Sequence, residues 1–120
     1  MKLIRSFRFA INGLKASFRS QPNFRIHIMM GSLAILLGVV LHIAAGEWVT
    51  LLLCIGSVLI LELINTAIER LCDFVEKNHH PEIKYIKDIV AGAVLVSAAV
   101  SLSIGAIIFL PKIITFIHSI

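Results

Sequence analysis

Four polar side chains lie on one stripe at the end of an apolar segment. They are Glu62, Asn65, Glu69 and Asp73, spaced three, four and four residues apart, and residues 48–61 before them carry no charge. At about 100° per residue of helix they fall within an arc of about 80°. A carboxylate on a membrane helix costs on the order of a few kcal/mol unless it faces a partner or water. The stripe therefore indicates a site, and a divalent cation with a phosphate ligand would suit it.

The chemistry that such a site could perform is phosphoryl transfer. Mg²⁺ takes carboxylate and phosphate oxygens, while Lys87 can offer a point charge to phosphate and Asp88 adds an acceptor. Glu62, the deepest of the carboxylates, suits the role of general base toward an incoming hydroxyl. The chain contains neither a G-x-x-x-x-G-K-[ST] loop nor a glycine-rich kinase loop. A nucleotide site here would therefore be a non-standard one.

Each of these residues also has a plain structural interpretation. Polar side chains in membrane spans hold helices together, and Asn65 taken alone fits that role better than the role of a ligand. Asp73 and Glu76, taken alone, are typical of solvated loop charges. The combination of four polar residues on one arc, followed by Lys87 and Asp88, is what favours a functional site.

The composition indicates an integral membrane protein with a single domain. The chain has 120 residues, 58% of them hydrophobic, and a mean hydropathy of +0.96, far above that of a soluble domain. The net charge is +4, and residues 1–25 hold six basic side chains and no acidic one. Next to a membrane span, such a cluster marks an anionic lipid surface rather than nucleic acid. Cys54 and Cys72 would lie about 27 Å apart on one helix, too far for a disulfide.

The apolar pattern predicts an all-α membrane protein. Apolar residues at helical spacing predict an N-terminal amphipathic surface helix over residues 1–22, lying in the cytoplasmic interface. Pro22 disfavours helix at the residue before it and so separates this helix from the next. Three transmembrane helices are expected at residues 25–45, 48–73 and 86–110.

The connections between these spans are predicted from glycine, proline and charge. Gly46-Glu47 is expected to form a very short turn between the first two spans, and residues 74–87 a polar connection to the third. Pro111 is expected to end the third helix. The first connection has no Lys or Arg, whereas residues 70–88 carry four. Positive-inside counting therefore places the N-terminus, the second connection and the polar stripe on the cytoplasmic side, where ATP is found.

The motifs resemble those of a known family. The run from Glu62 to Glu69, with the letters E-L-I-N-T-A-I-E, and Asp73 four residues later resemble the signature of the prokaryotic diacylglycerol kinase family, which includes the undecaprenol kinases of Gram-positive bacteria. Lys87-Asp88, followed by A-G-A-V-L from residue 91, is similar to its second motif. Residues 6–14 and 23–27 resemble its N-terminal helix and the start of its first span. The resemblance covers nearly the whole chain.

The resemblance implies a small homotrimeric kinase with active sites shared between subunits. It implies transfer of the ATP γ-phosphate, with Mg²⁺, to the hydroxyl of diacylglycerol or undecaprenol at the bacterial cytoplasmic (inner) membrane. By match to the motif, Glu62 would be the catalytic base, Glu69 would hold the metal and Asn65 would support the site. Asp73, Lys87 and Asp88 would bind nucleotide or organise its pocket. His80 lies in a loop where the family can place a histidine that contacts nucleotide, and the alternative for it is a solvent-exposed loop side chain.

One position departs from the family pattern. The family commonly has a second metal-binding Glu just before the first span, and this chain has Gln21 there. A neutral amide can offer one oxygen but removes a charge, so the number of metal ions is open. Arg25-Ile26-His27 is closer to the undecaprenol-kinase branch than to the diacylglycerol branch, and the acceptor lipid stays open between the two.

Two other classes of membrane protein are compatible with the stripe. An ion- or proton-conducting subunit would also place carboxylates along one helix, but it would not need Lys87-Asp88 beside them. A non-catalytic assembly subunit would use the polar groups as contacts between helices and would tolerate Glu62→Gln and Glu69→Gln. The motif match ranks a lipid kinase above both.

Overall fold

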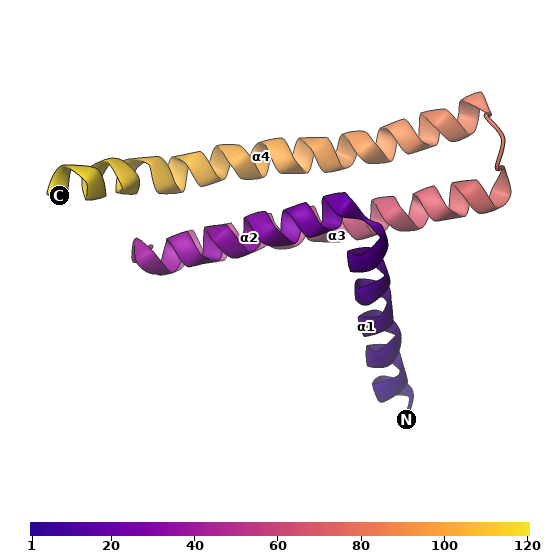
Figure 1. Cartoon of the computed structure of the whole chain (residues 1–120), viewed down its shortest axis with the longest axis horizontal. Coiled ribbons are helices and arrows are strands. Elements are labelled where there is room, and N and C mark those ends of the chain that lie inside the picture. Colours follow the sequence, from indigo (N-terminus) through magenta and orange to yellow (C-terminus); the bar gives the residue numbers. More distant parts are fainter.

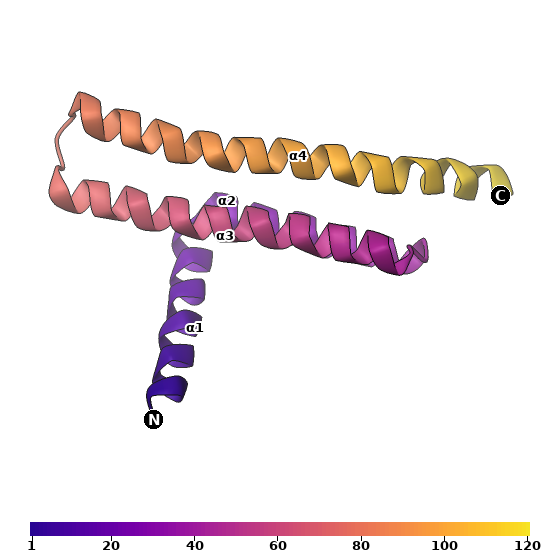
Figure 2. The same ribbon diagram turned by 180° about the vertical axis from the view of Figure 1, so that it is seen from behind.

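The protein is built from four α-helices joined by short connections. The computed structural model describes all 120 residues. The helices are α1 (Lys2–Ser20), α2 (Pro22–Val40), α3 (Ala45–Val75) and α4 (Pro81–Ser119). Helices α3 and α4 form a long antiparallel hairpin, α2 lies along the first part of α3, and α1 projects sideways from this bundle (Figures 1 and 2). The predicted all-α fold is confirmed.

Three of the four helices suit a lipid environment. Helices α2, α3 and α4 are each long and apolar enough to cross a membrane, as the sequence predicts. Only 12 of the 120 residues are buried, so most large apolar side chains point outward. In water such an exposed apolar surface would be unfavourable, whereas lipid tails are as apolar as the side chains themselves. The outward faces of these helices are therefore expected to contact lipid or other copies of the chain.

The corner between α1 and α2 is fixed by a proline and an arginine. Gln21 is extended between the two helices, and Pro22 occupies the first turn of α2, where its fixed φ favours a helix start. One guanidinium nitrogen of Arg25, Nη1, donates to the carbonyls of Phe18 at 2.7 Å and Arg19 at 3.0 Å. These carbonyls lack partners inside α1, so the guanidinium stabilises the end of that helix. The predicted break at this point is confirmed.

The turn between α2 and α3 lies earlier than predicted. It comprises Leu41 to Ala44, with His42 in the left-handed region at φ 53°, whereas Gly46 and Glu47 belong to the first turn of α3. The carboxylate of Glu47 accepts the Ala44 N–H at 2.9 Å. A glutamate in this position caps a helix start, and here capping outweighs the tendency of glycine to form a turn.

The connection between α3 and α4 is shorter than predicted. Only Glu76 to His80 are non-helical, in place of the expected residues 74–87. Pro81 occupies the first turn of α4, and Nδ1 of His80 accepts the Glu82 N–H at 3.1 Å. A proline in this position and a side-chain cap before it both favour a helix start. The helix therefore begins before residue 86, the predicted start of the third span; the limits of the membrane itself stay predictions.

Helix α4 continues through Pro111 to Ser119, so the predicted end at Pro111 is wrong. Proline removes one backbone hydrogen bond, but membrane helices tolerate it where neighbouring groups compensate. Contacts with the rest of the protein hold α4 on both sides of this residue. Phe109 is buried in the apolar core before it, and Lys112 lies 3.1 Å from the Glu47 carboxylate after it.

Two glycines bring α2 and α3 close together. A Cβ added at Gly38 would lie 2.9 Å from the ring of Trp48, and one added at Gly31 would lie 2.9 Å from the side chain of Ile55. Side chains larger than hydrogen at these positions would push the helices apart. The close approach at Gly31 brings the preceding turn of α2, which contains His27, against the polar part of α3.

Candidate active site

Glu62 is the only buried charged residue of the chain. Its Oε1 atom lies 3.3 Å from Nε2 of His27 on α2. A carboxylate at membrane depth requires a partner or water, and the imidazole is that partner here. The sequence motifs assign no role to His27. The available signal was an ionisable side chain inside an apolar segment, which is itself a mark of function.

One turn further along α3, Asn65 and Glu69 form a second polar pair. The side-chain Nδ2 of Asn65 donates to Oε1 of Glu69 at 3.3 Å. The Oδ1 atom of Asn65 is buried and has no hydrogen-bond partner. Buried polar atoms are nearly always paired, so this oxygen marks a place where a cation, a donor or a water molecule would be favourable. Asn65 therefore orients Glu69 and presents a free acceptor beside it.

A charged pocket lies beyond Glu69, where α3 and α4 meet at their connection. Oδ1 of Asp73 accepts from Nζ of Lys87 at 2.5 Å, and Oδ2 of Asp88 accepts from Nζ of Lys84 at 2.6 Å. The pocket has a volume of about 330 Å³, and nine of its ten lining residues are polar. The structure brings together here all four residues that the resemblance implies for nucleotide, namely Asp73, His80, Lys87 and Asp88.

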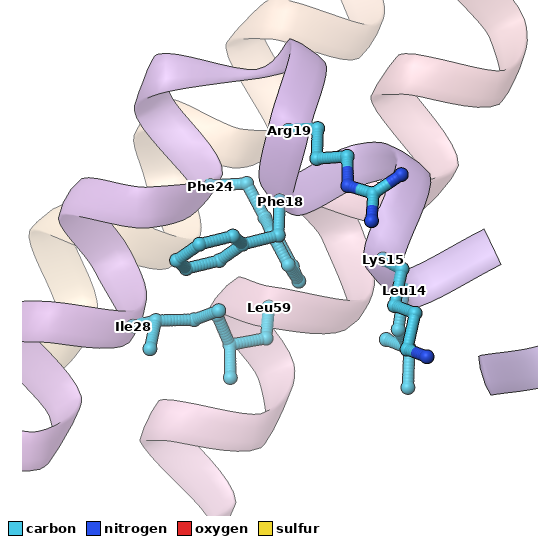
Figure 3. A pocket seen from close by; sticks show the side chains of 7 residues that line it. All are labelled: Leu14, Lys15, Phe18, Arg19, Phe24, Ile28 and Leu59. Carbon is cyan, nitrogen blue, oxygen red and sulfur yellow. The ribbon is translucent and has the colours of Figure 1, made fainter. Parts of the chain in front are cut away.

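Two apolar cavities lie on the other side of Glu62. The first, of about 510 Å³, is formed where α1 meets α2 and α3. Figure 3 shows the rings of Phe18 and Phe24 with Ile28 and Leu59 on one side of it, and the charged ends of Lys15 and Arg19 on the other. Leu59 lies one turn before Glu62 on α3, so this cavity ends close to the buried carboxylate.

The second apolar cavity, of about 490 Å³, lies between α2, α3 and α4. It extends from His27 at the polar end toward Phe109 near the far end of α4, and most of its lining is hydrophobic. Val58, one turn before Glu62, also lines it. His27 therefore borders the second cavity, and residues one turn before Glu62 border both cavities.

The predicted site residues form an elongated strip rather than a compact cluster. Eleven residues separate Glu62 from Asp73, which corresponds to about 16 Å along the helix axis. Gln21 lies apart, at the α1–α2 corner, and no hydrogen bond joins its side chain to Glu69. Along α3 the environment changes from apolar cavities to a buried carboxylate, then to an amide–carboxylate pair, and finally to the charged pocket.

The donor atoms of one chain are few for a metal ion. No group of three or more His, Cys, Asp or Glu residues is placed to hold one. Mg²⁺ is usually bound through one or two carboxylates together with substrate phosphates and water. Glu69, beside the unpaired oxygen of Asn65, fits such a sparse donor set.

Comparison with known proteins decides which class of membrane protein carries this site. The sequence model of prokaryotic diacylglycerol kinase matches residues 8–109. The chain belongs to this family. Membership confirms the predicted resemblance and the expectation of a membrane lipid kinase, and it sets aside the ion-conducting and non-catalytic subunits.

The relatives of this chain fall under two names, undecaprenol kinase and diacylglycerol kinase. The chain is 38% identical to an undecaprenol kinase of Bacillus subtilis over 112 aligned residues. This alignment covers 93% of this chain and 91% of the Bacillus protein. It is 39% identical over 114 residues to a diacylglycerol kinase of Synechocystis, covering 94% of this chain and 65% of that protein. A diacylglycerol kinase of Pseudomonas aeruginosa is 28% identical over 99 residues, or 82% of this chain and 80% of that protein.

Proposed function

We propose that this chain transfers the γ-phosphate of ATP to the hydroxyl of a membrane lipid along the polar strip of α3, defined as Glu62, Asn65, Glu69 and Asp73. The observation that carries the proposal is the order of environments along this helix. A lipid and a nucleotide differ in polarity and must meet at one point. The strip offers apolar cavities at one end, a charged pocket at the other, and a buried carboxylate between them.

At the lipid end, Glu62 acts as the general base. Leu59 and Val58, one turn before it on α3, line the first and second apolar cavity respectively, so the hydroxyl of a lipid would arrive near the carboxylate with its hydrocarbon chain in apolar surroundings. The carboxylate accepts the hydroxyl proton as the lipid oxygen bonds to the γ-phosphorus of ATP, while the bond from that phosphorus to the bridging oxygen breaks and ADP leaves. Because little covalent chemistry falls to the protein in phosphoryl transfer, holding this oxygen in place is the main contribution of the site.

At the nucleotide end, the charged pocket binds ATP. Lys87 and Asp88 lie on one wall, and Asp73 and His80 on the others. A nucleotide phosphate can replace the Asp73 carboxylate as the partner of Lys87, because that ion pair is partly exposed and therefore costs little to exchange. The nucleotide then extends from this pocket along α3 toward Glu62.

Between the two ends, Glu69 and Asn65 would hold Mg²⁺, with Gln21 as a weaker contributor of one amide oxygen. The bound ion would neutralise charge on the transferring phosphate. Asn65 keeps the Glu69 carboxylate in a fixed orientation through its Nδ2 donor. Neutralising Glu62 or Glu69 by a change to glutamine should reduce activity and leave folding intact, because the amide keeps the shape of the side chain and removing an unfavourable charge can even stabilise a protein.

We infer that the functional unit is a homotrimer in the bacterial inner membrane. The outward apolar faces of α2, α3 and α4 and the sparse donor set of a single chain both support sites completed by a neighbouring subunit. The basic residues of positions 1–25 support a cytoplasmic N-terminus, with α1 on the membrane surface. The connection Glu76 to His80 then also faces the cytoplasm.

Two acceptor lipids are candidates, and undecaprenol is favoured. The match to the Bacillus protein named undecaprenol kinase spans nearly the full length of both chains, whereas the Synechocystis protein named diacylglycerol kinase is longer. Either lipid would place an apolar chain in the cavities and its hydroxyl beside Glu62.

The test is phosphate transfer by the purified protein in micelles, with ATP and Mg²⁺, to undecaprenol and to diacylglycerol offered separately. The expected result is transfer to undecaprenol above that to diacylglycerol, lost in Glu62→Gln. A matched control is Glu47→Gln, the same change of carboxylate to amide at the far end of α3, which should retain transfer. Absence of transfer to either lipid from assembled protein would contradict the proposed function.

A further inference from the structure

We propose that His27 is a positioning residue, which holds the Glu62 carboxylate in the orientation needed to accept a proton from the lipid hydroxyl. This inference rests on the proposed role of Glu62 as general base. The structure supports it through the contact itself, through the way in which α2 fixes the imidazole, and through the absence of competing partners.

The contact joins the buried carboxylate to a single polar group. The Glu62 side chain is 5% exposed and that of His27 is 26% exposed, with 3.3 Å between Oε1 and Nε2. No side chain or backbone N–H donates a hydrogen bond to this carboxylate, and the imidazole of His27, at ion-pair distance, is its one close polar neighbour. Hydrogen bonds of catalytic groups are often long in ligand-free proteins and shorten when substrate binds. The imidazole can thus hold one carboxylate oxygen and leave the other for the lipid hydroxyl.

Helix α2 holds the imidazole through contacts on either side of it. Phe24, about one turn before His27, is among the most buried residues of the chain, and Gly31, about one turn after it, is buried against Ile55 of α3. These three α2 positions share one face of the helix because they are spaced three and four residues apart. The side chain of His27 is therefore carried on a part of α2 that has little freedom to move relative to α3.

No other charged group competes for this imidazole. Apart from His27, the second apolar cavity has Cys54 as its only ionisable lining residue, and α4 contributes none. On the α1 side, Lys15 and Arg19 line the first cavity, and Arg25 is bonded to the end of α1. Glu62 is therefore the partner that orients the imidazole, and the imidazole in turn orients the carboxylate of Glu62.

The kinetic test compares two amides at position 27. A glutamine can place its amide nitrogen near the position of Nε2, whereas the shorter asparagine reaches only the position of Nδ1. We expect His27→Asn to lower kcat by about 100-fold with KM for ATP unchanged, and His27→Gln to restore most of that loss. His118→Gln, at the exposed end of α4, is the matched control and should leave kcat unchanged.

Two kinetic outcomes would overturn the proposal when measured on assembled protein. One is wild-type kcat in His27→Asn. The other is an equal loss in the glutamine and asparagine variants, which would indicate a role in packing rather than a donor at the Nε2 position.

A spectroscopic test examines the contact without any activity. The imidazole ¹⁵N signals of His27 are recorded by NMR in the wild-type protein and in Glu62→Gln, both in micelles. We expect the His27 signals to shift in the variant and those of His118 to stay in place; an unchanged His27 signal would overturn the proposal. If Glu62→Gln retained full transfer while the His27 signals shifted, the base role and the positioning role would both be wrong, and the contact alone would stand.

Discussion

The two ends of the α3–α4 hairpin each carry an ion pair between the helices, in different surroundings. At the end where α3 begins, Glu47 lies 3.1 Å from Lys112, and its carboxylate also accepts the Ala44 N–H. At the end where α3 finishes, Asp73 lies 2.5 Å from Lys87 inside the charged pocket. The first pair lies next to the apolar core around Phe109, and the second has several further charges beside it.

The difference shows how the same type of contact can serve structure or binding. The Glu47 carboxylate is occupied by a lysine and by a backbone donor, so it stabilises a helix start and the position of α4. The Asp73–Lys87 pair lines an open polar cavity with spare donors and acceptors, so either partner can exchange for a ligand. Breaking the first pair should therefore affect stability, and breaking the second should affect catalysis.

The largest expected effect is at the charged pocket. Lys87→Ala should reduce kcat/KM for ATP by about 100-fold, because a cation next to the nucleotide phosphates is lost. The reversed pair Asp73→Lys with Lys87→Asp should keep an ion pair and still lack activity. Initial rates at varied ATP concentration measure both variants, with Lys112→Ala as the matched control at the other end of the hairpin. Activity restored by the reversed pair would show that Lys87 is structural.

A second comparison uses the two glycine contacts between α2 and α3. Gly31→Ala and Gly38→Ala each add a methyl group against a neighbour 2.9 Å away, and each should lower the free energy of unfolding by about 1–3 kcal/mol. Only Gly31→Ala should also lower kcat, by about tenfold or more, because it displaces the turn that carries His27. Unfolding curves and kcat of the folded fraction separate the two effects. Equal kcat in both variants would contradict the account.

At the Glu47–Lys112 end, a change in stability alone is expected. Glu47→Ala removes both the helix cap and the ion pair, whereas Glu47→Gln keeps an oxygen that can accept the Ala44 N–H. The thermal midpoint should therefore fall further in the alanine variant, and the activity of the folded protein should stay at the wild-type level in both. Thermal unfolding in micelles gives the order of the two midpoints. Loss of phosphate transfer in folded Glu47→Ala would show that the end of the hairpin where α3 begins belongs to the active site.

The smallest effect is expected at the corner between α1 and α2. Gln21→Glu adds a carboxylate at the position where the family commonly has one, and it should lower the Mg²⁺ concentration needed for half-maximal activity. The change should be modest, because Glu69 and the nucleotide phosphates would supply most of the ligands in the proposed site. An unchanged Mg²⁺ titration would place Gln21 outside the metal site.

The sequence predicts the helices better than their ends, for a physical reason. Long apolar stretches leave few alternatives to a membrane helix, so all three spans were predictable. The ends depend on single side chains: Glu47 caps α3 earlier than its glycine neighbour suggested, and Pro81 starts α4 before the predicted span. Pro111 stays helical because contacts distant in sequence hold the residues around it.

In the candidate site, too, the features within one helix were predictable and the contacts between helices were not. The polar strip was predictable because its members lie on one helix, where spacing determines which residues share a face. His27 was not, since its contact with Glu62 depends on how closely α2 approaches α3 at Gly31. Contacts across helices depend on packing of both partners, which spacing within one segment does not describe.

The most direct test of the central claim measures nucleotide binding and phosphate transfer on the same preparation of Glu62→Gln. With ATP in the charged pocket and the general base at the other end of the strip, nucleotide binding and phosphate transfer should separate. We expect Glu62→Gln to bind ATP with the affinity of the wild type and to lose transfer to the lipid. Transfer at the wild-type rate in Glu62→Gln would contradict the account.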